Sequence, residues 1–171
     1  DGMVRVWGEK NQWVLTRMRE LAHLYIDQDR HDEADQLLTK ALEVARDELG
    51  NEHQHTVSLV NSLAVLRTKE GHWEEAERLF DEALEGRSDR LGDNHPMTLE
   101  TKNDLALLYK EKGHYDKAEP LLLEAVEGRR LKLGDEHPHT LESLNNLIEL
   151  YEAWGKPEKA AQWRAELRIV D

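Results

Sequence analysis

The chain has no cysteine, only one phenylalanine in its 171 residues, and few basic residues relative to acidic ones. Without cysteine it can form neither a disulfide framework nor a thiolate site, which fits a reducing, cytoplasmic compartment. Its 23 Lys and Arg residues are outnumbered by 36 Asp and Glu residues, which leaves a net charge of -13. Nucleic acid and anionic membranes attract clustered cations, so we expect neither as a partner.

Long apolar runs and catalytic motifs are also missing from the sequence. No segment approaches the roughly 20 apolar residues of a membrane span, and no secretory signal pattern opens the chain. The sequence contains no glycine-rich phosphate loop, no HExxH motif and no nucleophile elbow. We therefore predict that the protein is not an enzyme and needs no cofactor.

What the sequence does contain is a repeat of 42 residues. Self-similarity at a fixed period is typical of a solenoid, in which each unit buries its apolar face on its neighbours and the array offers an extended surface to a partner. Binding is therefore favoured over catalysis. The recurring positions are Leu49-Gly50, Leu91-Gly92 and Leu133-Gly134; His53, His95 and His137; Thr56, Thr98 and Thr140; Asn61, Asn103 and Asn145; and Gly71, Gly113 and Gly155.

Each repeat is predicted to hold two antiparallel helices, here called helix A and helix B. In the unit 93–134, Pro96 suits a first helical turn, Gly113 is expected to end helix A in a left-handed conformation, and Pro120 is expected to bend helix B or cost it a hydrogen bond. The apolar spacing predicts helices near 13–28, 31–48, 54–70, 73–90, 96–112, 115–132, 138–154 and 157–168.

The chain is predicted to form one all-α repeat domain. Residues 9–50, 51–92 and 93–134 are the first three repeats, and 135–171 is a fourth repeat with a C-terminal cap helix. Residues 1–8 align with 85–92 and 127–134, so we interpret them as the tail of a preceding helix B, a better fit than the alternative of a propeller strand. Met3, Val4, Val6 and Trp7 would then form an apolar edge, and residues 1–13 could support self-association.

The repeat resembles the tetratricopeptide repeat, and its length and signature resemble the kinesin-light-chain-like subgroup. The signature reads Leu91-Gly92-Asp93-Asn94-His95-Pro96-Met97-Thr98-Leu99, followed by Asn103 and Leu105. The stretch from Leu150 to Arg164 is similar to the last repeat of bacterial multidomain proteins. The resemblance implies a right-handed superhelical solenoid of antiparallel helix pairs, whose A helices line a concave groove that binds an extended peptide or a partner protein.

The resemblance places a set of helix A residues in this groove. Asn61, Asn103 and Asn145 would form a ladder of amides that reads a peptide backbone, although a structural bond between neighbouring helices is the alternative. The groove carries more carboxylates than cations, which predicts a neutral or basic ligand. The candidate ligand-binding residues are Arg19, His23, Asn61, Val65, Glu100, Asn103, Asp104, Leu107, Glu142, Asn145, Asn146 and Glu149.

The nine histidines raise the question of a metal site. His53 with His55, and His137 with His139, have the spacing of ligand pairs. Neighbouring units of a helical array, however, stack about 10 Å apart, whereas zinc ligands lie near 2 Å from one centre. We therefore predict that the recurrent histidines are structural and that the chain binds no metal. Among the tryptophans, Trp7 and Trp13 are expected to be exposed.

The sequence thus predicts a protein-interaction module. Two alternatives stay open at this stage. One is a structural or self-associating array that packs through its N-terminal edge, and the other is a regulatory module of an enzyme encoded upstream.

Overall fold

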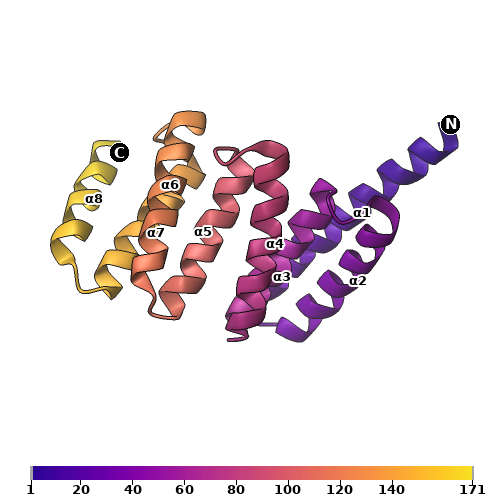
Figure 1. The fold of residues 1–171 in the computed structure, drawn as a ribbon, viewed down its shortest axis with the longest axis horizontal. Coiled ribbons are helices and arrows are strands. Elements are labelled where there is room, and N and C mark those ends of the chain that lie inside the picture. The colour runs from indigo at the N-terminus through magenta and orange to yellow at the C-terminus, as the bar shows by residue number, and fades with distance from the viewer. Residues whose placement is uncertain (1, 171) are drawn as a thin grey trace. The chain divides into compact units, whose positions relative to one another are not determined.

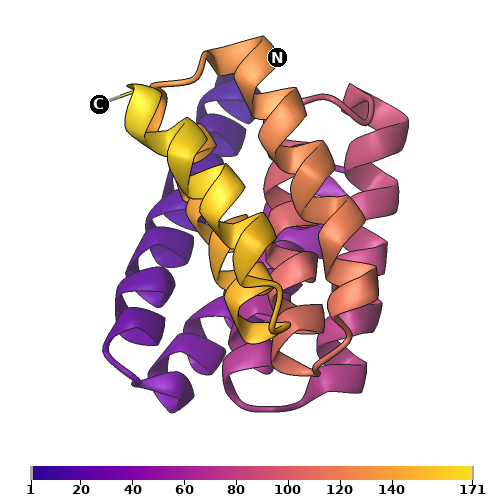
Figure 2. The same cartoon turned by 90° about the vertical axis from the view of Figure 1, so that its left-hand side faces the viewer.

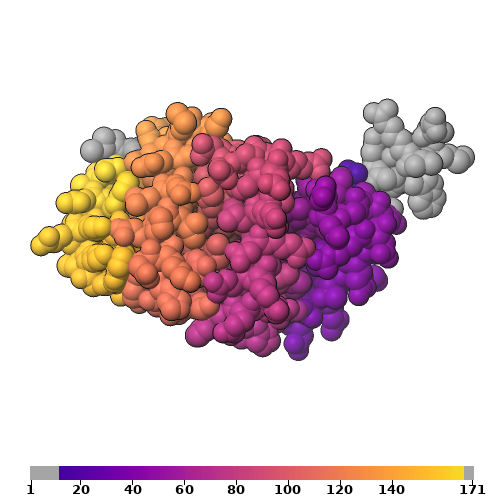
Figure 3. Space-filling model, viewed as in Figure 1, coloured from indigo at the N-terminus to yellow at the C-terminus, as the bar shows by residue number. Residues whose placement is uncertain are grey.

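The computed structural model describes the backbone of residues 2–170 and the side chains of residues 12–167 (Figure 3). In this part of the chain every regular element is an α-helix, and the fold is of the all-α helical-repeat class. Figure 1 shows the helices, which follow one another through short turns. Their bounds are α1 Gly2–Asp27, α2 His31–Leu49, α3 Gln54–Lys69, α4 Trp73–Leu91, α5 Pro96–Glu111, α6 Tyr115–Leu133, α7 Pro138–Ala153 and α8 Pro157–Val170.

Helices α2 to α8 begin and end within two residues of the predicted bounds. Helix α1 differs, because it starts at Gly2 rather than near residue 13 and continues through Gly8 without a turn. No proline interrupts this segment, and a single glycine costs a helix only about 1 kcal/mol. The side chains of Met3, Val4, Val6 and Trp7, which were predicted to form an apolar edge, lie outside the described residues.

The chain divides into two compact units, residues 1–86 and 87–171, and the boundary falls within α4. In the first unit α2 packs against both α1 and α3, and α1 also contacts α3. In the second unit α6 packs against α5 and α7, α7 also contacts α5, and α8 lies beside α7 (Figure 2). Each unit has a core built on leucine and alanine, including Leu38 and Ala41 in the first and Leu122 and Leu144 in the second.

The turns between helices A and B follow the predicted chemistry. Gly113 ends α5 with φ 74°, a left-handed conformation that glycine adopts without strain. The first repeat has Asp29 at the equivalent position, with φ 57°, which is the one left-handed non-glycine residue in the described chain. Helix α6 continues through Pro120 as one element.

Small residues lie where the two helices of a hairpin approach each other. Ala106 on α5 and Ala118 on α6 are fully buried. Gly128 on α6 comes so close to α5 that a Cβ at this position would lie 2.6 Å from Cδ1 of Leu99. At the equivalent Gly86 the nearest atom, Cγ2 of Val57, would be 3.2 Å away. The hairpin of the second unit is therefore the more tightly packed at this position.

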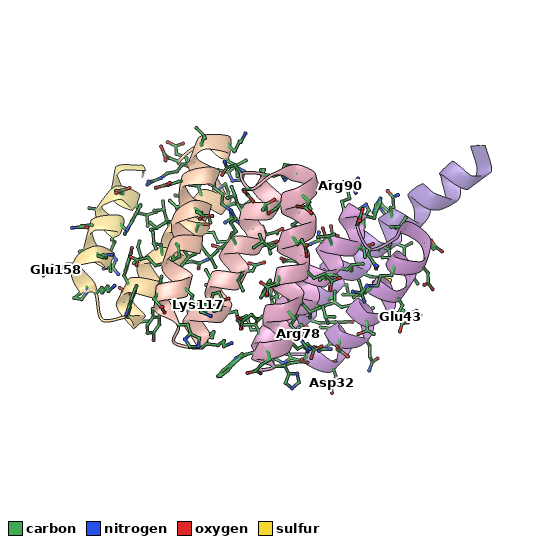
Figure 4. All side chains as sticks on the ribbon, viewed as in Figure 1. Asp32, Glu43, Arg78, Arg90, Lys117 and Glu158 are labelled. Atoms are coloured by element: carbon green, nitrogen blue, oxygen red, sulfur yellow. The ribbon has the colours of Figure 1, made fainter. Side chains whose placement is uncertain are left out.

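The outer surfaces of the B helices are charged. Asp32 and Glu43 on α2, Arg78 on α4, Lys117 on α6 and Glu158 on α8 are all exposed, and Figure 4 shows them projecting from the ribbon. The signs are mixed, as expected for a solvated surface. Among the described residues, none of the helices is long and apolar enough to span a membrane.

Candidate functional site

The recurrent histidines begin the A helices. His53, His95 and His137 are the N-caps of α3, α5 and α7, each with an extended backbone. In each case Nδ1 accepts a hydrogen bond of 3.2 Å from the backbone N–H two residues later. This bond satisfies one of the amide groups that a helix N-terminus leaves without a partner, so the predicted structural role of these histidines is confirmed.

The recurrent threonines lie in the first turn of the A helices and form hydrogen bonds across the turn that precedes each helix. Oγ1 of Thr98 donates to the carbonyl of Gly92 at 2.9 Å, and Oγ1 of Thr140 donates to that of Gly134 at 2.8 Å. The side chain therefore ties the start of each helix A to the end of the preceding helix B. Within residues 12–167 no three His, Asp or Glu side chains are grouped so as to hold a metal ion.

The three asparagines of the predicted ladder lie in different environments. Asn61 and Asn103 are buried, with 5% and 1% of their surfaces exposed, whereas Asn145 is exposed. Oδ1 of Asn103 accepts bonds from Oγ of Ser143 at 3.0 Å and from Nδ2 of Asn146 at 3.1 Å. Asn103 therefore has the structural role that was left open as an alternative, because it links α5 to α7.

Two buried arginines, neither of which was predicted as a site residue, lie beneath the predicted site. Arg129 on α6 is 3% exposed, and its Nη1 donates to the carbonyl of His139 at 2.7 Å, to Oγ of Ser143 at 2.7 Å and to Oε2 of Glu142 at 3.4 Å. Arg87 repeats this pattern with the carbonyl of Met97, with Thr101 and with Glu100. The available signal was a Gly-Arg pair, 86–87 and 128–129, that recurs at the repeat period.

These arginines offset part of the negative charge predicted for the site. Glu100 and Glu142 are each paired with a buried arginine, and Nζ of Lys110 lies 2.8 Å from Oε2 of Glu149. The carboxylates keep exposed surface, since their side chains are about half accessible. Counting only helix A residues overestimated the charge, because the compensating arginines come from helix B.

The predicted site residues fall into two sets. Asp104, Leu107, Asn145, Asn146 and Glu149 join Glu100, Asn103 and Glu142 on the adjacent helices α5 and α7 of the second unit. Arg19, His23, Asn61 and Val65 lie on α1 and α3 of the first unit, where Nε2 of His23 is 2.8 Å from Oγ of Ser62. The set on α5 and α7, called here the α5–α7 face, has the larger number of polar side chains.

A small pocket adjoins the α5–α7 face. It has a volume of about 130 Å³ and is lined by Pro96, Met97, Glu100, Arg129, Leu133 and His139. All hydrogen bonds that Arg129 makes to described residues run through Nη1. The remaining N–H groups of this guanidinium therefore keep the capacity to donate, next to the Glu100 carboxylate.

A family comparison assigns this architecture. The tetratricopeptide repeat model matches residues 14–87, 56–130 and 115–165. The chain belongs to the tetratricopeptide repeat family. Repeats of this family generally mediate protein–protein interactions and serve as scaffolds rather than catalysts. No curated protein matches the sequence.

Solved structures place the array among kinesin-light-chain-like repeats. It is similar to a putative kinesin light chain with nearly identical TPR-like repeats from Podosopora anserina, at 26% identity and a TM-score of 0.81, covering 93% of this chain and 75% of that one. A second structure of that protein, a variant form, gives 27% identity and a TM-score of 0.72, covering 91% and 74%. BtubC (BKLC) from P. vanneervenii shares the fold at 23% identity and a TM-score of 0.77, covering 94% of this chain. The chain spans 64% of the length of BtubC.

Proposed function

We propose that this tetratricopeptide array is a protein-interaction module whose α5–α7 face binds an extended, neutral or basic peptide segment of a partner protein. The observation that carries the proposal is the exposed amide of Asn145, which lies between the carboxylates of Glu142 and Glu149 on α7. An amide offers both a donor and an acceptor, the two groups that an extended peptide backbone presents.

The buried Asn103 holds α7, the helix that carries Asn145, in position. Its bonds to Ser143 and Asn146 hold α7 against α5 and fix the Asn146 amide. Because Asn103 is buried, we assign it a positioning role and give the contact with the peptide backbone to Asn145. A face whose side chains are held in place loses less conformational entropy when it binds.

The charges of the face favour an uncharged or cationic ligand. Glu142 and Glu149 are about half exposed, while the arginine that pairs with Glu142 is buried. A lysine or arginine of the ligand can therefore approach the carboxylates from solvent, whereas an acidic side chain would meet them first and be repelled. The pairing with Arg129 and Lys110 limits the attraction, so a ligand with few charges is also accepted.

The adjoining pocket provides a position for one ligand side chain. Met97, Pro96 and Leu133 supply apolar walls, and Arg129 and Glu100 supply a donor and an acceptor. An uncharged amide side chain, such as that of glutamine, matches both polar groups at once. This contact would add side-chain specificity to the backbone recognition by Asn145.

A display selection of random peptides on the purified chain tests the proposal, with washes at low and high salt. We expect enrichment of uncharged and Lys- or Arg-containing peptides, with salt weakening the cationic ones. Asn145→Ala and Glu149→Gln should reduce binding, because they remove the amide and the carboxylate. Lys117→Ala on the exposed surface of α6 is the matched control and should bind like the wild type.

Two results would contradict the proposal. The first is enrichment of Asp- and Glu-rich peptides whose binding depends on Asn145. The second is peptide binding that Asn145→Ala and Glu149→Gln leave unchanged while Lys117→Ala reduces it. Circular dichroism of each variant separates loss of binding from loss of fold.

A further inference from the structure

A series of buried hydrogen bonds runs from α6 through α7 to α5. Nη1 of Arg129 donates to Oγ of Ser143 at 2.7 Å, and the Ser143 hydroxyl donates to Oδ1 of Asn103 at 3.0 Å. Nδ2 of Asn146 donates to the same Oδ1 at 3.1 Å. Arg129, Ser143 and Asn103 are buried, with 3%, 0% and 1% of their surfaces exposed. These three hydrogen bonds are called here the Arg129 relay.

The direction of each bond in the Arg129 relay follows from the arginine. A guanidinium group can only donate, so Ser143 accepts from Arg129 and gives its single proton to Asn103. Asn103 must therefore present its carbonyl oxygen, rather than its NH2 group, to Ser143. Asn146 faces the same oxygen and must present its NH2 group. Reversing either amide would leave buried polar groups without partners, which is costly.

This direction leaves the carbonyl oxygen of Asn146 available to a ligand. Among the described residues Oδ1 of Asn146 has no hydrogen-bond partner, and the atom is accessible to solvent. Glu142, four residues earlier, and Glu149, three residues later, lie on the same side of α7. Both carboxylates are about half exposed. The surface around Asn146 therefore presents hydrogen-bond acceptors.

The preceding repeat has an equivalent arginine but different residues at the later steps. Nη1 of Arg87 donates to Oγ1 of Thr101 at 2.7 Å, but this hydroxyl donates to the carbonyl of Met97 on its own helix at 3.4 Å. The residue equivalent to Asn146 is Asp104, whose carboxylate has no N–H group to donate. Thr101 is therefore a matched control for Ser143, because its hydroxyl also accepts from a buried arginine but passes its proton elsewhere.

We propose that Arg129 is a positioning residue, which through the relay holds the carbonyl oxygen of Asn146 outward to bind the ammonium group of a ligand lysine. This inference rests on the proposed function, since it names a side chain that the α5–α7 face selects. An ammonium group has three donors and no acceptor, so it can bond the amide oxygen and a carboxylate at the same time. A reversed amide would present its NH2 group and repel the cation.

The orientation of Asn146 matters more than the carboxylates for this choice. Glu142 and Glu149 add negative charge to the site, but both already pair with cations of the chain itself. The amide oxygen of Asn146 is the acceptor that no described residue uses. Loss of the relay should therefore reduce the preference for lysine although every charged residue of the face is retained.

Nuclear magnetic resonance of the isotope-labelled chain tests the relay without a ligand. The side-chain NH2 group of Asn146 should exchange slowly with solvent in the wild type, because it is bonded to Asn103. Ser143→Ala keeps the arginine but breaks the relay, so this exchange should become roughly five- to tenfold faster, the effect of one hydrogen bond. Thr101→Val removes the equivalent hydroxyl of the preceding repeat and should leave the exchange unchanged.

Titration with two blocked tripeptides, Gly-Lys-Gly and Gly-norleucine-Gly, tests the selectivity. The two probes share an aliphatic stem and differ in the ammonium group, and they are titrated to concentrations on the order of 10 mM because such short peptides bind weakly. The wild type should bind the lysine peptide about tenfold more tightly, the effect of one hydrogen bond to a charged group. Asn146→Ala and Ser143→Ala should both reduce this preference severalfold, whereas Thr101→Val should keep it.

The proposal is overturned if the Asn146 amide exchanges rapidly in the wild type, or if the lysine peptide binds no more tightly than the norleucine peptide. A preference that Ser143→Ala leaves intact, or that Thr101→Val reduces equally, would also overturn it. The exchange measurement uses no ligand, so a failed relay is distinguished from a failure of the proposed function, which Asn145→Ala tests in the display selection.

Discussion

At equivalent positions, the two units connect helix A to the preceding helix B through different pairs of side chains. In the second unit, Oη of Tyr151 on α7 donates to Oε1 of Glu119 on α6 at 2.7 Å. The equivalent pair in the first unit is Arg67 on α3 and Asp35 on α2, joined by an ion pair of 2.7 Å. Both pairs connect a helix A to the preceding helix B, 32 residues earlier in the sequence. The repeat therefore determines where side chains meet, and the residue types that meet there are free to change.

The electrostatic consequences differ between the two pairs. Burial alone would lower the pKa of Arg67, but its bonds with Glu75, Glu70 and Asp35 raise it above the ordinary value. Burial raises the pKa of Tyr151, and the bond to Glu119 raises it further. Both groups thus keep their ordinary charge state, the first as a cation and the second as a neutral phenol.

A second pair of equivalent positions, 129 and 45, differs even more in residue type. Arg129 on α6 is the centre of a buried polar network, whereas the equivalent residue of α2, Ala45, is a fully buried alanine in the apolar core of the first unit. A polar network of this kind stabilises only while all of its members are present. The two units should therefore respond differently to substitution at matched positions.

The largest expected effect is that of Arg129→Ala. It leaves the carbonyl of His139 and the hydroxyl of Ser143 without their donor, and it opens a cavity. We expect a loss of about 2–4 kcal/mol in the free energy of unfolding, measured by urea denaturation. Arg130→Ala, at the neighbouring and more accessible arginine, should cost less than about 1 kcal/mol. Equal effects of the two substitutions would contradict the role given to Arg129.

The second prediction compares the glycines at the close approach of helices A and B. Gly128→Ala places a Cβ 2.6 Å from Leu99 and should destabilise by about 1–3 kcal/mol. Gly86→Ala meets Val57 at 3.2 Å, so the strain is smaller and is offset by the helix propensity of alanine, about 1 kcal/mol. Thermal unfolding should separate the two variants. A Gly86 variant less stable than the Gly128 variant would reverse the comparison.

The third prediction concerns the turn of the first repeat. Asp29 has φ 57°, whereas the second and later repeats have glycine in the same left-handed conformation. Asp29→Gly should therefore stabilise the chain, by roughly 0.5–1 kcal/mol, because it relieves the unfavourable conformation. Gly113→Asp is the reverse experiment in the second unit and should destabilise by a similar amount. Calorimetric midpoints that move in the other direction would contradict the explanation.

The smallest expected effect is a pH dependence at His55 in the first unit. Burial lowers the pKa of His55 below its ordinary value, and the nearby His53 and Arg19 lower it further. The unfolded chain therefore binds this proton more readily than the folded chain does. The stability contributed by neutral His55 is complete above the ordinary pKa of 6.5 and is lost as the pH falls below it. Thermal scans between pH 7.5 and 5 should show a weaker acid destabilisation in His55→Gln. Identical profiles would exclude this contribution.

The local structure could be predicted closely from the sequence, because its causes are local. Histidine before the A helices, glycine after them and the apolar periodicity determined seven of the eight helices to within two residues. The failure at α1 has a local reason as well, since no proline interrupts residues 1–12 and Gly8 alone costs a helix only about 1 kcal/mol. The repeat also predicted the general class, because tetratricopeptide repeats generally mediate protein–protein interactions.

The candidate site was predictable only in part. The residues of the α5–α7 face were correctly placed on adjacent helices, but nothing in the sequence distinguishes Asn103 from Asn145. Their burial differs because Ser143 and Asn146, about 40 residues later, cover Asn103. The arginine beneath Glu142 escaped prediction because it comes from the preceding helix B.

The sequence by itself therefore determined helices α2 to α8, their turns, the repeat and the family, all of which depend on residues within one 42-residue period. The tertiary structure decided which of several equivalent residues are buried, which carboxylates are neutralised and which leucines remain exposed. The physical reason is that burial and charge pairing in a solenoid come from the neighbouring repeat. Leu24 is exposed whereas the equivalent Leu66 and Leu150 are fully buried, according to what lies beside each of them.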